Sequence, residues 1–168
     1  AESLLESLND QWRPIIRIPF AIGLRIGELS GINIEDVDLE QRTVSVPRRI
    51  AKRADSIRTV PILDCVYEAF RAACQGRGPG APVFETNRGN RIYASVRQRF
   101  ARAAERAKLP MRVHDAAGEL IAKRTFHSTR HSFATWLRTN SAERELVEDL
   151  MGHKRGSVTD RYLSFDIG

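Results

Sequence analysis

The apolar residues of this chain follow a helical period in most segments, but between residues 42 and 63 the period changes to that of β-strands. Thr43–Val46 alternates polar and apolar side chains, and residues 57–62 are rich in β-branched side chains. A basic connection, residues 48–56, separates the two runs. We therefore expect one antiparallel hairpin in an otherwise helical chain, so the predicted fold class is mainly α with a small antiparallel β-sheet.

Five further segments carry apolar residues at helical spacing and are expected to be helices. They are residues 11–24, 64–75, 94–108, a helix starting near His127, and 140–151. Pro19 should bend or break the first helix because its ring removes a backbone N–H donor. The helix near His127 should bury Phe133, Trp136 and Leu137.

Two shorter features complete the expected fold. Asn140–Glu143 has the pattern of a capping box, which would begin the last helix, and Gly152 would end that helix in a left-handed conformation. Residues 111–124 place short apolar runs on either side of an Asp-Ala-Ala-Gly turn, which allows a second hairpin. The sequence assigns no role to this second hairpin.

The length of the chain is that of one domain. At 168 residues and 19.0 kDa, residues 1–168 are expected to form a single domain with a hydrophobic core of its own. The chain begins at Ala1 without an initiator methionine or a signal peptide, so we expect it to be part of a longer protein. No apolar run has the length of a membrane span, and we expect no membrane partner.

The charge of the chain favours a polyanionic partner. The net charge is +6 and the isoelectric point about 9.9, although 21 acidic residues keep the surface mixed. Between residues 88 and 112 only Glu105 is acidic, and Arg99, Arg102 and Arg106 fall on one stripe of the expected helix. Such a stripe is by default a solvated helix face, but it also suits contacts with a DNA backbone.

Two cysteines, Cys65 and Cys74, lie nine residues apart in an expected helix. That spacing suits neither a local disulfide nor a zinc knuckle. We expect reduced thiols and a cytoplasmic protein.

Arg25 and Glu28 lie three residues apart and allow two interpretations. They could form an ordinary ion pair on a helix surface. Alternatively, the planar guanidinium of Arg25 binds a phosphate while the carboxylate of Glu28 holds that guanidinium in place.

A second group of candidate residues occupies the last third of the chain. His127 and Arg130 are three residues apart, so they share one helix face. Gly152 and His153 follow at the end of the next helix, and Tyr162 comes nine residues after His153. Each piece has an ordinary interpretation, as a solvated helix face, a helix cap or a half-buried aromatic residue.

Taken together, these spacings resemble the carboxy-terminal boxes of the tyrosine recombinase (phage integrase) family. Gly23–Leu29 is similar to the first arginine box of that family, with Ile22 where threonine is usual. Lys52–Pro61 is similar to the family's lysine hairpin, although the adjacent Arg53 leaves the register open. The resemblance covers residues 11–162 and implies the DNA breaking-rejoining fold of integrase catalytic cores.

The resemblance implies how a DNA phosphodiester would be bound. Arg25 and Arg130 would hold the scissile phosphate, with Glu28 supporting Arg25 and His153 adding a hydrogen bond. Arg53 would contact the DNA backbone.

The resemblance also implies the chemistry. Tyr162 would be the nucleophile, and His127 would assist its deprotonation because a tyrosine normally titrates near 10. Lys52 would protonate the departing 5′ oxygen. The product would be a 3′-phosphotyrosine bond that a second 5′ hydroxyl can reverse, so no metal, ATP or other cofactor is expected.

Partners follow from the same resemblance. We expect double-stranded DNA as the substrate and assembly into a tetramer on DNA by the full-length protein. The family's amino-terminal DNA-clamping domain is absent from this chain, so the chain alone should bind DNA weakly and as a monomer.

Three other functions would use some of the same residues. His127 and His131 have the spacing of a zinc-binding helix, but Ser128 stands where metalloproteases have glutamate and no third ligand lies nearby in the sequence. A type IB topoisomerase uses a similar set of groups but would relax any supercoiled plasmid. A basic helical DNA-binding module without chemistry would lose nothing measurable on Tyr162→Phe.

Overall fold

The computed structural model describes residues 2–152 of the chain. These residues form seven α-helices, two short 3-10 helices and five strands. The helices are α1 (Glu2–Glu6), α2 (Trp12–Ile22), α3 (Ile26–Gly31), α4 (Asp64–Cys74), α5 (Tyr93–Arg106), α6 (His127–Thr139) and α7 (Arg144–Leu150). The predicted fold class, mainly α with small antiparallel sheets, is confirmed.

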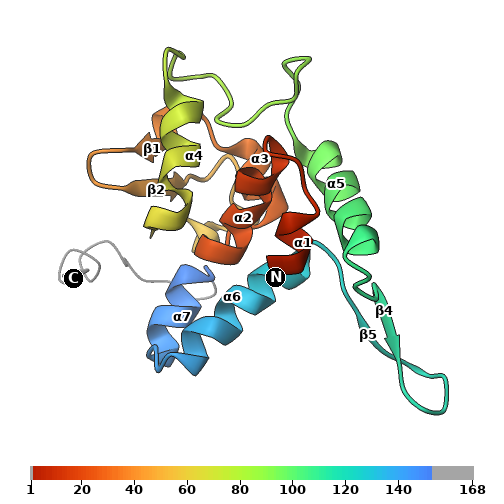
Figure 1. Ribbon diagram of the computed structural model, residues 1–168. Helices are drawn as coiled ribbons and strands as arrows, with labels where there is room; N and C mark the ends of the chain where they lie inside the picture. Colours follow the sequence, from red (N-terminus) through yellow and green to blue (C-terminus); the bar gives the residue numbers. More distant parts are fainter. Residues whose placement is uncertain (1, 153–168) are drawn as a thin grey trace.

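Helix α2 is the centre of the fold (Figure 1). It packs against α1, α4, α5 and α6, and its buried residues include Trp12, Ile16, Ile18 and Ile22. Apolar residues surround this helix on several sides, which is the pattern of a core helix rather than a surface helix.

The main sheet has three antiparallel strands in the order β1 (Val37–Asp38), β2 (Thr43–Val46) and β3 (Arg58–Pro61). The predicted hairpin is β2 and β3, with Val44 opposite Val60 and Val46 opposite Arg58. The 3-10 helix η1 (Ile34–Asp36) precedes the sheet, and η2 (Ala54–Ser56) lies in the connection between β2 and β3.

A second, two-stranded ribbon follows α5. Strands β4 (Arg112–His114) and β5 (Leu120–Lys123) pair antiparallel, so the hairpin that the sequence allowed is present. Figure 1 shows this ribbon extending away from the helices, and Leu120 and Ile121 are exposed on it.

Pro19 does not break α2, so a break, one of the two outcomes expected at this residue, does not occur. The helix continues to Ile22 and ends at Gly23, whose backbone N–H donates to the Pro19 carbonyl oxygen at 3.2 Å. The proline removes one hydrogen bond close to the helix end, where burial of Ile18 and Ile22 outweighs that loss.

Two expectations about α6 and α7 were wrong. Trp136 is 55% exposed, because Phe133 and Ala134 define the buried face of α6 and Trp136 lies to one side of it. Asn140 ends α6 instead of capping α7, since its side-chain amide donates to the Trp136 carbonyl oxygen at 2.8 Å. Helix α7 begins at Arg144 without a side-chain cap.

No helix among residues 2–152 has the length and apolar character needed to cross a membrane. The two cysteines are free, with Cys65 exposed and Cys74 half-buried.

Candidate active site

Five of the predicted site residues line one cavity of about 400 Å³. Its walls come from the start of α3, the connection after β2, and the amino-terminal ends of α5 and α6. The described lining residues are Leu24, Arg25, Ile26, Gly27, Glu28, Ile50, Lys52, Tyr93, Phe126, His127 and Arg130. Residues more than a hundred positions apart in the sequence therefore meet at one place.

Arg25 and Glu28 form an ion pair whose carboxylate is buried and whose guanidinium is partly exposed, and not the surface pair that was one of the two interpretations. Arg25 is the residue before α3, in extended conformation, and Glu28 lies in the first turn. The Glu28 carboxylate accepts from the Arg25 backbone N–H and from its Nη1, both at 2.7 Å. Because Glu28 is only 1% exposed, the Arg25 guanidinium is held by a carboxylate that water does not screen.

A third charged residue, Arg58 in β3, joins this pair. Its Nη1 and Nη2 donate to the two Glu28 carboxylate oxygens at 3.0 and 2.8 Å, which is a two-pronged ion pair. The sequence motifs indicated Arg58 only as part of a strand. The available signal was the strand period, which places Arg58 on the same buried face as Val60.

The arginines keep Glu28 ionised. Burial by itself would raise the pKa of Glu28, but hydrogen bonds and charge from Arg58, with hydrogen bonds from Arg25, lower that pKa to about 2. Glu28 is therefore a carboxylate at neutral pH and remains one well into the acid range.

Arg130 of α6 is the largest fully buried side chain of the described residues. Its guanidinium donates to the carbonyl oxygen of Gly23 at 2.5 Å and to that of Met151. Burial, followed by the positive charges of Arg25 and Arg58, lowers the pKa of Arg130 to about 9, and Glu28 offsets part of this effect. Arg130 is thus still a cation at neutral pH, and a bound anion would relieve the repulsion between it and the other arginines.

The carboxyl end of α7 rests on the same three arginines. Arg58 Nε donates to the Leu150 carbonyl oxygen at 2.8 Å, while Arg25 and Arg130 both donate to the Met151 carbonyl oxygen. Carbonyls at the end of a helix lack partners within the helix and carry its negative partial charge, so cations satisfy them well.

The net charge of the cluster suits the binding of an anion. Three guanidinium groups and one carboxylate leave a net charge of +2 beside the cavity. The ordinary ligand of convergent guanidinium groups in proteins is a phosphate or a carboxylate.

Two glycines allow this close packing. Gly23 has φ +67°, and a Cβ atom there would lie 2.4 Å from Phe133 Cδ1 of α6. Gly152 has φ +59°, and a Cβ atom there would lie 3.0 Å from Arg58 Nη1. Gly23 therefore has no room for a side chain, and at Gly152 the left-handed backbone and the nearby Arg58 both disfavour one, which suits the close approach of α6 and α7 to the cluster.

His127 and Lys52 lie at the outer part of the cavity. His127 is the first residue of α6, is exposed, and has its ring edge-on to His131 with 4.9 Å between ring centroids. Lys52 is exposed in the connection after β2 and lines the cavity, whereas the neighbouring Arg53 does not. Among residues 2–152, no three His, Cys, Asp or Glu side chains are grouped to hold a metal ion.

The remaining predicted residues lie elsewhere. Arg99, Arg102 and Arg106 of α5 are exposed and do not line the cavity. Arg99 stacks on Trp12 at 5.4 Å from the ring centroid, and Arg106 donates to a backbone carbonyl at 3.3 Å. His153 and Tyr162 lie outside the described residues.

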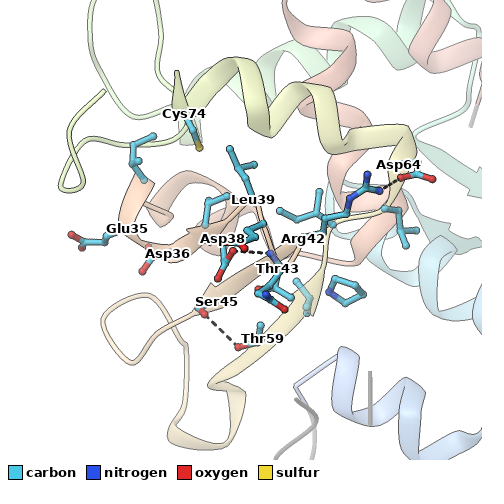
Figure 2. Close-up of a pocket in the computed structure, with 18 of the residues that line it drawn as sticks. Glu35, Asp36, Asp38, Leu39, Arg42, Thr43, Ser45, Thr59, Asp64 and Cys74 are labelled. Carbon is cyan, nitrogen blue, oxygen red and sulfur yellow. Dashed lines mark hydrogen bonds and ion pairs between the residues drawn. The ribbon is translucent and has the colours of Figure 1, made fainter. Parts of the chain in front are cut away.

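A larger cavity, of about 1180 Å³, lies between the three-stranded sheet and α4 (Figure 2). Its rim carries the acidic residues Glu35, Asp36, Asp38 and Asp64, and Arg42 pairs with Asp64 at 2.5 Å. None of the predicted site residues lines it. An acidic rim repels phosphate, so the smaller cavity is the candidate site.

The family model of the phage integrase family matches residues 1–166 of the chain. The chain belongs to the phage integrase family. This membership, predicted from the spacing of the boxes, is thereby confirmed.

Similar proteins come from the same family. The chain is 30% identical over 159 residues to tyrosine recombinase XerC of Shewanella oneidensis, and the match covers 92% of the chain and 47% of XerC. The chain therefore spans about half the length of this curated relative.

Solved structures share the fold at low identity. The Tn1549 transposon integrase in complex with circular intermediate DNA has a TM-score of 0.70 at 23% identity, covering 99% of this chain and 60% of that one. The lambda integrase tetramer bound to a Holliday junction has a TM-score of 0.67 at 16% identity, covering 91% and 44%. The fold of this family member is thus the integrase catalytic core, as predicted.

Proposed function

We propose that this chain is the catalytic domain of a site-specific DNA recombinase, which cuts and rejoins DNA strands through a 3′-phosphotyrosine intermediate. The observation that carries the proposal is the cavity lined by Arg25, Arg130, Lys52 and His127 in a member of the phage integrase family. A DNA phosphodiester is an anion whose attack requires cations around its non-bridging oxygens.

Arg25 and Arg130 bind the scissile phosphate in this proposal. Glu28 orients the Arg25 guanidinium, whose remaining N–H groups can point into the cavity, and buried carbonyls orient that of Arg130. Such donors are fixed before the substrate arrives, so little reorganisation is needed as charge develops on phosphorus.

The strand is cut by exchange of one phosphoester bond for another. The Tyr162 hydroxyl oxygen bonds to phosphorus, the bond from phosphorus to the 5′ oxygen breaks, and His127 accepts the tyrosine proton. Lys52 gives a proton to the departing 5′ oxygen. The roles of Tyr162 and His153, which adds a hydrogen bond to the phosphate, rest on their spacing in the sequence. Because the number of ester bonds is unchanged, the mechanism consumes neither ATP nor another energy source.

Partners and assembly are part of the proposal. Double-stranded DNA is the substrate, and a longer protein containing this domain assembles as a tetramer on it, as the lambda integrase tetramer does on a Holliday junction. Residues 1–168 form one catalytic domain, and the protein acts in the cytoplasm, where free cysteines such as Cys65 and Cys74 persist.

The test is SDS-resistant attachment of the protein to DNA. Nicked duplexes prepared from the genome that encodes the chain would be incubated with the wild type and with Tyr162→Phe. We expect an adduct with the wild type alone, because removing the phenolic hydroxyl removes the nucleophile while leaving the cation cluster and DNA binding intact.

The outcomes separate three functions. An adduct formed on defined sites supports a recombinase, whereas relaxation of any supercoiled plasmid supports a type IB topoisomerase. If a longer protein that includes the DNA-clamping domain binds DNA tightly and still forms no adduct, the catalytic proposal is wrong and the domain is a DNA-binding module.

A further inference from the structure

Arg58 makes four hydrogen bonds to three separate segments. It donates to both carboxylate oxygens of Glu28, to the Leu150 carbonyl oxygen at the end of α7, and to the Ser56 carbonyl oxygen at 3.0 Å. Its side chain is 2% exposed and the Glu28 side chain 1%. Burial of two charges costs much desolvation energy, so such a pair persists only with this kind of full hydrogen bonding.

Arg58 lies behind the candidate site and not in it. The described lining of the cavity contains Arg25, Glu28 and Arg130 but not Arg58. Arg58 therefore reaches a bound phosphate only through the groups that it holds.

The position of Arg58 links three parts of the site. Arg58 lies in β3, which follows the connection that carries Lys52. It binds Glu28, which in turn holds Arg25. It also binds the end of α7, which is followed in the sequence by Gly152 and His153. Gly152 leaves space beside this side chain, since a Cβ atom at that position would lie 3.0 Å from Arg58 Nη1.

We propose that Arg58 is a positioning residue for phosphoryl transfer: it fixes Glu28, and through it Arg25, and anchors the end of α7 ahead of His153. This inference rests on the proposed function of the site and adds a residue to it.

The charge and the shape of Arg58 have separable effects. The charged groups facing Glu28 are Arg25, which directly precedes α3, Arg58 from β3 and Arg130 from α6. Without Arg58, burial of Glu28 favours its neutral form, and a protonated carboxyl holds the Arg25 guanidinium less firmly. A lysine at position 58 keeps Glu28 ionised, but one ammonium group cannot span Glu28 and Leu150 together.

The first experiment measures the rate of adduct formation, DNA affinity and thermal unfolding of Arg58→Met and Arg58→Lys across pH. The matched control is Arg71→Met, which also removes one arginine paired with a glutamate, on the exposed face of α4. We expect Arg58→Met to slow adduct formation about 100-fold at unchanged DNA affinity, because small misplacements of catalytic groups have effects of this size.

The pH dependence of the rate of adduct formation shows whether Arg58 acts through the charge of Glu28. We expect the rate of adduct formation by Arg58→Met to fall further as the pH is lowered, because Glu28 becomes protonated. The rate for Arg58→Lys should be reduced at all pH values but should not show this further fall in acid. His127 lines the same cavity and is unchanged in all variants. A rate and pH profile equal to those of the wild type, with only a lower unfolding temperature, would make Arg58 merely structural and overturn the proposal.

A second experiment needs no DNA. Nuclear magnetic resonance of the free chain would follow the Glu28 side-chain carboxyl carbon and the Arg25 Nε–H group. In Arg58→Met we expect Glu28 to titrate at higher pH than in the wild type, and the Arg25 signal to broaden as Glu28 is protonated.

This measurement separates the two proposals. If the wild type forms no adduct but Arg58→Met shifts the Glu28 titration and releases Arg25, the recombinase function fails and the positioning by Arg58 stands. If adducts form while Glu28 and Arg25 behave alike in both proteins, the positioning by Arg58 is wrong and the recombinase function stands.

Discussion

Gly23 shows at the scale of one residue how the fold builds the candidate site. Its left-handed conformation ends α2, its bare Cα lets Phe133 of α6 pack against it, and its carbonyl oxygen accepts from Arg130. The position therefore carries two separate demands, one on the backbone angle and one on space. Gly76 carries only the first, since its φ is +68° and a Cβ atom there would meet nothing within 4 Å.

Comparison of Gly23→Ala with Gly76→Ala isolates the demand for space. Both variants place a side chain in the left-handed region, which costs about 1–2 kcal/mol. Gly23→Ala also forces a contact with Phe133, so we expect a further loss of about 1–3 kcal/mol and weaker DNA binding through Arg130. Urea unfolding of both variants measures the difference; equal losses would mean that α6 moves aside without cost.

Helix α5 illustrates at the scale of an element why a charged stripe is ambiguous. Val96, Phe100 and Ala103 face the core, and Arg99, Arg102 and Arg106 are exposed. The structure adds that Arg99 and Arg106 have partners within the chain, in Trp12 and in the Ser7 carbonyl. Their binding to DNA stays a prediction.

Salt dependence tests this helix. Changing Arg99, Arg102 and Arg106 to Gln should make the slope of log affinity against log salt shallower by roughly 0.9 for each DNA phosphate that these arginines neutralise in the wild type. The control changes Arg17, Arg71 and Arg144, which pair with carboxylates elsewhere, to Gln and removes the same charge. A slope as steep as that of the wild type would place α5 outside the interface.

At the scale of the whole molecule, Glu28 connects elements that are distant in the sequence. Its carboxylate, on α3, binds Arg25 before that helix and Arg58 in β3, and Arg58 also donates to the end of α7. Acid should therefore weaken the entire fold through this one group.

The sign of the pH effect follows from the lowered pKa of Glu28. Because that pKa falls from 4.5 to about 2 on folding, the stability from the ionised carboxylate is fully present above about 4.5 and is lost as pH falls toward 2. The shift corresponds to about 3 kcal/mol. We expect Glu28→Gln to be destabilised by about that amount at pH 7, with the gap closing in acid. Urea unfolding at several pH values checks this, and a gap independent of pH would refute the linkage.

Local patterns in the sequence determined the elements and the family. The period-2 run at Thr43–Val46, the helical stripe of Val96 and Phe100, and the spacing of His127 and Arg130 are properties of neighbouring residues, so they could be read without a structure. The predictions for Trp136 and Asn140 were wrong because packing leaves Trp136 exposed, and because the side chain of Asn140 bonds back to α6 and not forward to α7.

The tertiary structure alone decided how the charges are organised. Whether Arg25 and Glu28 form a surface pair or a buried one depends on Arg58, which lies 30 residues away from Glu28 in the sequence, and the depth of Arg130 depends on Gly23 and Met151. Desolvation and charge coupling act through space over a few ångströms, and spacing along the chain carries no information about them.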